Sequence, residues 1–364
     1  MRQVMKIAIA AATAATLTLA GCAPSAAPSP EPTNTGAAPT TSAPAPEPEP
    51  QETIKVGLAF DVGGRGDQSF NDSAAAGLDR AAEEFKGIET KDATAGADES
   101  ESVREERLQQ LIEAGYNNIV AVGFAYAASV GKVAAANPEV KFAIVDDASE
   151  ASQAPNVMNI TFAEHEGSFL VGAAAALKSE TGHIGFVGGV QIGLIEKFQA
   201  GFEAGAKAVK PDIKIDVNYL TQPPDFSGFG DPAKGEVAAK AMFDAGADIV
   251  YHAAGGSGGG VFNAAKAAGK WAIGVDADQA LTASPEVQDI IMTSMIKRVD
   301  VGVYTFIKSI HDGNFKAGEQ VFDLKVDGVG YSVTNGHIDD IVPKLEEFKA
   351  QIIAGSITVP ATVS

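Results

Sequence analysis

The sequence predicts an α/β protein made of two doubly wound lobes. From about residue 53 onward, short runs rich in Ile, Val and Phe alternate with helical patterns. This alternation is typical of parallel sheets covered by helices on both faces. The plan then recurs, because Ile54 and Ile119 stand as far apart in the chain as Ile184 and Ile249. We therefore expect two similar lobes that face each other across a cleft.

The length and composition agree with two folded units. The chain has 364 residues, of which 45% are hydrophobic and 20% charged, ordinary values for a globular protein. Its net charge is −20. Such an acidic chain cannot neutralise a row of phosphates, so we expect no nucleic-acid partner and no binding of the folded part to anionic lipid.

Residues 1–22 predict a lipoprotein signal peptide. A basic segment, MRQVMK, precedes the apolar run IAIAAATAATLTLA, which is short for a membrane span. The run ends in LAGC at residues 19–22, which resembles a bacterial lipobox, and Cys22 is the sole cysteine of the chain. A sole cysteine cannot form an internal disulfide. We expect Cys22 to be lipidated and to anchor the protein on the extracytoplasmic face of the cell membrane.

Residues 23–52 predict a disordered tether. Nine of the 18 prolines of the chain lie here, together with Ala, Ser, Thr and Glu and without an aromatic residue. A segment of this composition buries too little apolar surface to offset its ordering entropy.

The lobes are predicted from seven strands and the helices between them. The strands are TIKVGLAF, NNIVAVGF, KFAIVDD, HIGFVGGV, IKIDVNYL, ADIVYHAAG and WAIGVDAD, and the helices include residues 73–87, 101–116, 196–210 and 233–247. We assign residues 53–159 and about 281–325 to the first lobe. The second lobe takes residues 160–280 and about 326–364.

The polar, glycine-rich segments follow the strands. They are DVGGRGDQSFND, GFAYAAS, DDAS, GGVQIG, AAGGSGGG and DADQ. Ligands of open parallel sheets lie beyond the carboxyl ends of the strands. These segments are therefore the expected lips of the cleft between the lobes.

One segment is compatible with an enzyme. Residues 255–259, GGSGG, match the G-x-S-x-G nucleophile elbow, and a secreted serine esterase would use Ser257 with Asp276 or Asp278 and with His311 or His337. The chain has no HGGG-type oxyanion segment, and a glycine run around one serine matches the motif easily. The interpretation without catalysis is favoured.

Cofactor and metal sites are not predicted. No segment satisfies G-x-G-x-x-G or G-x-x-x-x-G-K-[ST], and the five histidines form no i, i+4 pair.

Several segments together resemble one family. DVGGRGDQSFND resembles the D-x-G-x-x-x-D-x-S-F-N signature of the basic membrane protein family, the lipid-anchored nucleoside-binding proteins of bacterial ABC importers. NITFAEHEGSFLVGAAAA, GFGDPAKGEVAAKAMFDAGADIV, AAGGSGGGVFNAAKAAGKWAIGVDADQ and TSMIKRVDVGVY look like further family blocks in family order. The resemblance spans about residues 53–355. It implies a type I periplasmic-binding-protein fold with two Rossmann-like lobes joined by a hinge.

The resemblance also implies a transport function in which the protein binds its ligand without changing any bond of it. The resemblance implies that a nucleoside, with a purine nucleoside as the expected ligand, is captured between the lobes and delivered to an ABC permease that a cytoplasmic ATPase drives. A sugar-binding protein of the same fold remains an alternative, and binding of ribose alone would distinguish it.

The resemblance assigns the base of the nucleoside to four residues. Phe70 and Phe229 would stack on it, and Asp61 and Asn71 would face its edge. A carboxylate that accepts from a purine ring N–H favours inosine or guanosine. Alternatives remain: Phe70 as a core anchor, Phe226 in place of Phe229, and helix capping by Asp61.

The resemblance assigns the ribose to Asp276 and Lys297. Asp276 would accept from the two ribose hydroxyls, and Lys297 would keep that carboxylate charged. Asp146, at the position matching Asp276, is also assigned to the ligand, with helix capping as its alternative. The backbone of Gly255 and Gly256, at a helix N-terminus, would approach the same oxygens.

Overall fold

The computed structural model describes residues 53–96 and 99–363. The predicted signal peptide, the lipobox with Cys22 and the whole predicted tether, residues 23–52, lie outside the described residues. No helix within the described ranges is long and apolar enough to cross a membrane.

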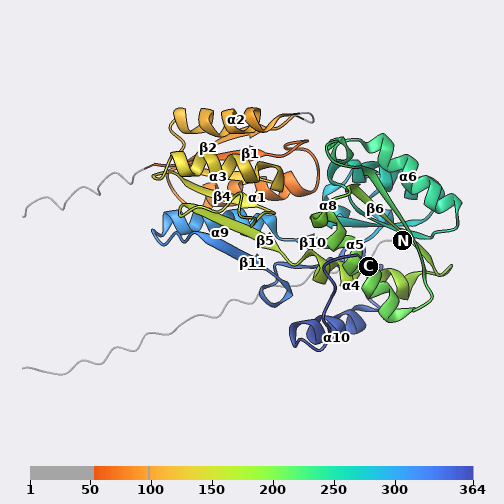
Figure 1. Ribbon diagram of the computed structural model, residues 1–364. Coiled ribbons are helices and arrows are strands. Elements are labelled where there is room, and N and C mark those ends of the chain that lie inside the picture. Colours follow the sequence, from red (N-terminus) through yellow and green to blue (C-terminus); the bar gives the residue numbers. More distant parts are fainter. Residues whose placement is uncertain (1–52, 97–98, 364) are drawn as a thin grey trace, which may run out of the picture. The chain divides into compact units, whose positions relative to one another are not determined.

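The described residues form two sheets of six strands (Figure 1). The strands of the first sheet are β1 (Ile54–Phe60), β2 (Ile88–Thr94), β3 (Asn118–Val122), β4 (Lys141–Val145), β5 (Val157–Phe162) and β11 (Gly318–Phe322). Those of the second sheet are β6 (His183–Val190), β7 (Lys214–Thr221), β8 (Ile249–Ala253), β9 (Trp271–Asp276), β10 (Ile291–Lys297) and β12 (Val329–Tyr331).

The two sheets share one topology. Their strand orders are β11-β5-β4-β3-β1-β2 and β12-β10-β9-β8-β6-β7, so each strand of one sheet has a counterpart at the same place in the other. All pairs are parallel except β10 with β12. The two-lobed α/β architecture predicted from the recurring spacing is confirmed.

Helices pack in pairs on both sheets. The first lobe has α1 (Phe70–Glu84), α2 (Glu101–Glu113), α3 (Ala127–Ala136) and α9 (Val299–His311), in the pairs α1 with α9 and α2 with α3. The second has α4 (Glu164–Lys178), α5 (Gly193–Val209), α6 (Pro232–Asp244), α7 (Gly258–Ala268), the short α8 (Gln279–Thr282) and α10 (Val342–Ile353), with α4 against α5 and α6 against α7.

Burial explains only part of the strand predictions, because the buried strands β5 and β10 were not predicted and the edge strand β7, which has no buried residue, was. Every residue of β3 and β8 is buried, as expected of central parallel strands covered on both faces. The edge strand β2 has five of its seven residues exposed, and β11 is also mostly exposed. Polar edge strands carry little apolar signal, and neither segment was predicted as a strand.

The expected lobe boundary in the C-terminal third is corrected by β10. This strand lies within the stretch of about 281–325 that the sequence assigned to the first lobe, yet it pairs with β9 in the second sheet. The chain enters the first lobe only after Lys297, because α9 packs on α1 and β11 pairs with β5. The chain therefore passes between the lobes after β5, after β10 and after β11.

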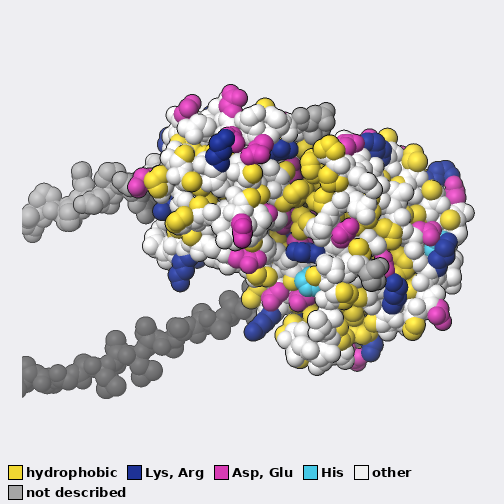
Figure 2. Space-filling view, viewed as in Figure 1, with side chains coloured by type: hydrophobic (Ala, Val, Ile, Leu, Met, Phe, Trp, Pro, Cys, Tyr) yellow, Lys and Arg dark blue, Asp and Glu magenta, His cyan; other side chains and the backbone are white. Residues whose placement is uncertain are grey.

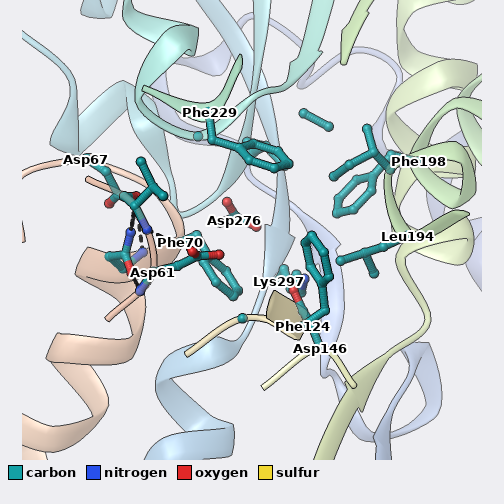
Figure 3. Close-up of a pocket in the computed structure, with 17 residues that line it drawn as sticks. Asp61, Asp67, Phe70, Phe124, Asp146, Leu194, Phe198, Phe229, Asp276 and Lys297 are labelled. Carbon is teal, nitrogen blue, oxygen red and sulfur yellow. Dashed lines mark hydrogen bonds and ion pairs between the residues drawn. The ribbon is translucent and has the colours of Figure 1, made fainter. Parts of the chain in front are cut away.

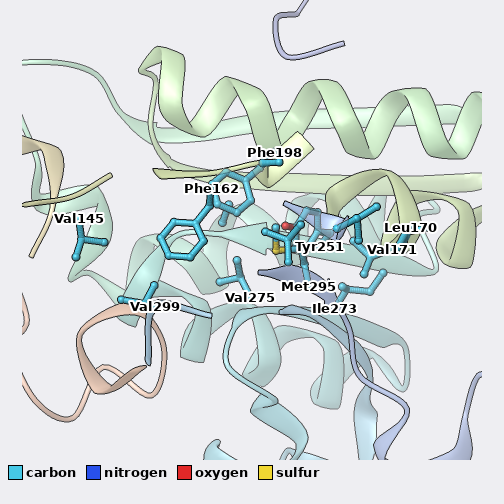
Figure 4. Close-up of a cluster of buried hydrophobic side chains, with 14 of the residues drawn as sticks. Val145, Phe162, Leu170, Val171, Phe198, Tyr251, Ile273, Val275, Met295 and Val299 are labelled. Carbon is cyan, nitrogen blue, oxygen red and sulfur yellow. The ribbon is translucent and has the colours of Figure 1, made fainter. Parts of the chain in front are cut away.

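A continuous apolar core runs through these crossings (Figure 4). It joins Val145 and Phe162 of the first sheet to Val275 and Met295 of the second, and it includes Phe198 of α5. Side chains of both signs are scattered over the face of the molecule that Figure 2 shows.

Candidate functional site

A cavity lies at the carboxyl ends of the strands, between the two sheets (Figure 3). The space between the atoms here amounts to about 580 Å³, part of it open to solvent. The first lobe lines it with Asp61, Val62, Asp67, Phe70, Asn71, Gly123, Phe124 and Asp146, and the second with Leu194, Ile195, Phe198, Phe229, Ala253, Gly255, Val275, Asp276 and Lys297.

The cavity brings together the residues singled out in the sequence, with one exception. Asp61, Phe70, Asn71, Asp146, Phe229, Gly255, Asp276 and Lys297 all line it. Gly256 is not among the lining residues; a Cβ at this position would lie 3.4 Å from the carbonyl oxygen of Phe229.

Asp67 organises the loop between β1 and α1. Its carboxylate accepts hydrogen bonds from the backbone N–H groups of Ser69, Asn71 and Asp72, at 2.8–3.1 Å. These N–H groups have no partner within the helix at its first turn, so Asp67 caps α1. The sequence left helix capping as an alternative role for Asp61; in the structure Asp67 has this role at α1.

Asn71 holds this loop against the end of β1. Its side-chain oxygen accepts from the backbone N–H of Asp61, and its NH₂ group donates to the carbonyl of Val62 and to Asp67. The polar atoms of Asn71 thus already have protein partners, and they fix the direction in which Asp61 leaves the strand.

Asp61 lies half-buried at one end of the cavity. A Cβ at Gly123 would approach one oxygen of Asp61 to 2.5 Å, so glycine at that position makes room for the carboxylate. Burial raises the pKa of Asp61 to about 6, while the hydrogen bond from the Val62 N–H and the charge of Arg104 act in the opposite direction. Near neutral pH Asp61 is therefore ionised, and among the described residues its carboxylate forms no ion pair with a cation.

Phe70 and Phe229 lie on opposite sides of the cavity in Figure 3. Phe70 is the first residue of α1, and Phe229 ends a short 3₁₀ turn, Ser227–Phe229. A Cβ at Gly189 of β6 would lie 2.5 Å from the ring of Phe229, so this glycine leaves space for the ring. The two rings come from different lobes.

Ser257 positions Phe229 and is not placed as a nucleophile. Its hydroxyl donates to the carbonyl of Gly228 at 2.7 Å and accepts from the backbone N–H of Asp231 at 2.8 Å. The candidate histidines of the esterase hypothesis pack elsewhere: the ring of His311 stacks on Phe85 and that of His337 lies against Trp271. The G-x-S-x-G match is a structural turn.

Lys297 is the only cation among the cavity-lining residues that the structure describes. Its side chain is 2% exposed, and its Nζ lies 2.6 Å from an oxygen of Asp146 and 3.5 Å from one of Glu164. The rings of Phe70, Phe162 and Phe198 surround the same Nζ, with centroids 5.1, 5.1 and 5.5 Å away. Asp146 belongs to the first lobe and Lys297 to the second, so this ion pair joins the lobes.

Asp146 and Asp276 occupy equivalent positions in the two lobes. Each follows or ends the matching strand, β4 or β9, and each has a left-handed backbone, with φ of 69° and 64°. Positive φ is uncommon for residues other than glycine and tends to occur at functional sites. Burial raises the pKa of both to about 6, although Lys297 opposes the shift.

The charge balance around Lys297 explains these shifts. Burial acts against the charge of Lys297, but the pKa of this residue is raised because Asp146, Glu164 and Asp276 all face it. One cation shared by three carboxylates leaves an excess of buried negative charge. A neutral ligand that donates hydrogen bonds suits such a cavity better than an anion.

Further contacts join the lobes at the rim. The hydroxyl of Ser69 donates to Asp276, and the side chain of Gln279 donates to the carbonyl of Gln68. The rings of Phe124 and Phe226 meet with centroids 5.9 Å apart. Phe226, which the sequence left as a substitute for Phe229, therefore contacts the opposite lobe and does not line the cavity.

Sequence reasoning missed Phe124, Leu194, Ile195 and Phe198 as lining residues, and Glu164 as a partner of Lys297. Phe124 lies in the strand-end segment GFAYAAS, and Leu194 directly follows the strand-end segment GGVQIG, so both positions could have been found from their place after a strand. Glu164 and Phe198 lie within helical segments, where apolar and charged residues are ordinary.

Among the described residues, no group of three or more His, Cys, Asp or Glu side chains is arranged to hold a metal ion.

Comparisons with known proteins agree with this architecture. The model of the family described as ABC transporter substrate-binding protein PnrA-like matches residues 54–363. The ABC transporter nucleoside-binding protein BmpA of Lactococcus lactis is 36% identical over 324 residues, which cover 85% of this chain and 89% of that protein. An uncharacterized lipoprotein of Pyrococcus abyssi is 37% identical over 288 residues, 76% of this chain and 69% of its own.

A solved structure is similar over nearly the whole described part. The ABC transporter solute-binding protein of Aeropyrum pernix has 32% identity and a TM-score of 0.74, covering 85% of this chain and 94% of that one.

Proposed function

Since this chain belongs to the family of PnrA-like ABC transporter substrate-binding proteins, we propose that it captures purine nucleosides between its lobes and delivers them to a membrane permease. The observation that carries the proposal is the cavity that combines two aromatic rings, one from each lobe, with a buried Asp–Lys arrangement. The Lactococcus relative, which is named as nucleoside-binding, supports the same ligand class.

The base fits the end of the cavity that Phe70, Phe229 and Asp61 line. Rings on opposite sides suit a flat heterocycle, and base–aromatic stacking contributes about 1–3 kcal/mol per base. The ionised carboxylate of Asp61 accepts a hydrogen bond from a ring N–H. Inosine and guanosine carry such an N–H in the pyrimidine part of the base, whereas adenosine does not.

The ribose fits the middle of the cavity. The carboxylate of Asp276 has one oxygen engaged by Ser69, and it accepts from the 2′- and 3′-hydroxyls of the sugar. The excess of negative charge around Lys297 favours a ligand that donates hydrogen bonds and carries no phosphate.

Closure of the lobes follows from a ligand that touches both. A nucleoside held by Phe70 and Asp61 on one side and by Phe229 and Asp276 on the other binds the closed state in preference to an open one. The permease then recognises the closed protein, and no bond of the ligand changes.

A ligand panel tests this function. Thermal shifts and calorimetry of the purified protein with inosine, guanosine, adenosine, uridine, cytidine, ribose and the free bases are expected to rank 6-oxopurine nucleosides first. A ligand at 100 times its Kd adds about 2.7 kcal/mol to the free energy of unfolding. Phe70→Ala should weaken nucleoside binding by about tenfold or more. Binding of ribose alone would favour the sugar-binding alternative and contradict the proposal.

We also propose that the protein is anchored by lipid at Cys22, outside the cytoplasmic membrane. The proposal rests on the lipobox-like sequence and on the relative named as a lipoprotein. In cells fed a radioactive fatty acid, the wild-type protein should be labelled and found in the membrane fraction. Cys22→Ser should lose both properties, while Ser25→Ala, three residues away, keeps them. Labelling of Cys22→Ser would refute the anchor.

A further inference from the structure

The cavity is polar at one end and apolar at the other. Its apolar end is formed by Leu194, Ile195 and Phe198 of α5. Leu194 and Phe198 are one helical turn apart and therefore share a face of α5. In Figure 3 they lie across the cavity from Asp61 and Asp67.

Lys297 lies between the polar side and the apolar end of the cavity. Its Nζ lies 5.1 Å from the ring of Phe70 on the polar side and 5.5 Å from the ring of Phe198 at the apolar end. Any ligand that spans the cavity thus meets Asp61 and Phe70 first, the Asp276–Lys297 region second, and Leu194 and Phe198 last.

A nucleoside has the same order of parts. In the furanose ring, C1′, which carries the base, and C4′, which carries C5′, lie on opposite sides of the ring oxygen. When the base stacks near Phe70 and the diol meets Asp276, C5′ points away from Phe70. The substituent on C5′ then reaches the apolar end.

The apolar end does not suit a charged substituent. Ile195 and Phe198 are 6% and 3% exposed, so a phosphate placed against them would lose its hydration without a free cation to replace it. Lys297 is paired with Asp146 and Glu164, and the neighbouring Lys197 lies 3.4 Å from Glu164. The nearest carboxylate, Asp146, would repel an anion.

The apolar end adjoins a groove on the surface, and Leu194 and Asp146 line both spaces. The rest of the groove is mixed in character: it is lined by Ala148, Phe162, Ala163, Val321 and Ala361 and also by Asp147, Thr161, His165, Lys197 and Glu319. A substituent on C5′ that is larger than a hydroxyl therefore meets the side chain of Leu194 at the boundary that the cavity and the groove share.

We infer that this site accepts purine nucleosides whose 5′ carbon carries an uncharged apolar group, such as a 5′-alkylthio group, and rejects 5′-phosphates. The inference rests on the proposed nucleoside function and names the subset of ligands within it. Each buried methylene-sized group strengthens binding by about fourfold.

Calorimetry with matched ligands tests the inference. The probes are inosine, 5′-deoxy-5′-methylthioinosine and inosine 5′-monophosphate, together with the same three forms of adenosine. The methylthio nucleoside should bind at least as tightly as its parent and up to about tenfold more tightly. The monophosphate should bind at least about 100-fold more weakly. A methylthio nucleoside that binds tenfold more weakly than its parent, or a monophosphate that equals the parent, would overturn the inference.

A variant assigns the preference to the apolar end. Leu194→Asn should lower the ratio of methylthio to parent affinity by about tenfold, because it places an amide against the substituent. Val237→Asn, on the exposed face of α6 where Val237 is 71% exposed, should leave the ratio unchanged. A purely structural role of Leu194 would weaken both ligands equally and leave the ratio constant, which would contradict the inference.

The two proposals fail in different ways. If neither inosine nor adenosine nor their derivatives bind, the nucleoside function itself is wrong. If the parents bind and the methylthio forms do not, only the inference about the apolar end is wrong.

Discussion

Lys297→Met is expected to lower the free energy of unfolding by about 3–5 kcal/mol at pH 7. Methionine is as long as the aliphatic part of the lysine side chain but lacks the ammonium group, which is the only cation near Asp146 and Glu164 among the described cavity-lining residues. Asp146 would then remain buried without an ion-pair partner, and Glu164 would keep only Lys197, 3.4 Å away. Urea denaturation of ligand-free wild type and variant measures the difference.

Two further variants make this result specific. In the Lys297→Met background, Asp146→Asn should restore much of the lost stability, because it removes the uncompensated charge. Lys234→Met removes a lysine that pairs with Asp231 at the surface, where the two side chains are 43% and 33% exposed, and should cost less than about 1 kcal/mol. A Lys297→Met protein as stable as Lys234→Met would show that the buried pair contributes little.

Asp276→Asn is expected to weaken nucleoside binding by about 100-fold and yet to stabilise the ligand-free protein. The amide cannot accept charge-assisted hydrogen bonds from both ribose hydroxyls, each of which contributes about 1.5–3 kcal/mol. It also removes a carboxylate whose pKa burial raises to about 6 in the folded protein. The gain in the free energy of unfolding at pH 7 should reach up to about 3 kcal/mol.

The pH dependence identifies the cause of the gain. The pKa of Asp276 in the fold, about 6, exceeds the unfolded value of 3.8, so the folded state binds more protons between these pH values. The contribution of Asp276 to the free energy of unfolding of the wild type is fully present below about pH 4 and is lost as the pH rises through about 6. Asp276→Asn should therefore match the wild type near pH 4 and exceed it above pH 6. A gain of equal size at both pH values would exclude the charge of Asp276 as its source.

A surface aspartate provides the matched control for Asp276. Asp289→Asn, in the same lobe, changes a carboxylate whose pKa is lowered by its hydrogen bond to Lys266. It should neither weaken nucleoside binding nor raise stability at pH 7. The contrast would mark Asp276 as a residue kept for binding at the expense of stability.

Much of the site could be predicted because parallel α/β sheets place function at strand ends. Asp61, Asp146 and Asp276 follow or end buried strands, and Phe70 begins a helix, so strand positions predict the edge at which they lie, while the family resemblance assigned these residues to a ligand. The sequence already disfavoured Ser257 as a nucleophile, because a glycine run around one serine matches the motif easily. In the structure the Ser257 hydroxyl instead forms two hydrogen bonds to the backbone of residues 228–231.

The sequence by itself determined the alternation of strands and helices, the repeat of the lobes and the polar loops between them, because period and composition are local properties. Only the tertiary structure decided that β10 belongs to the second sheet, that Glu164 shares Lys297 with Asp146, and that Leu194 and Phe198 close one end of the cavity. These features depend on where the chain crosses between lobes and on which face of α5 meets the cavity. The crossings and the orientation of α5 are set by strand pairing and by side-chain packing between segments that are distant in the chain. Such long-range contacts cannot be recognised in the local pattern of residues.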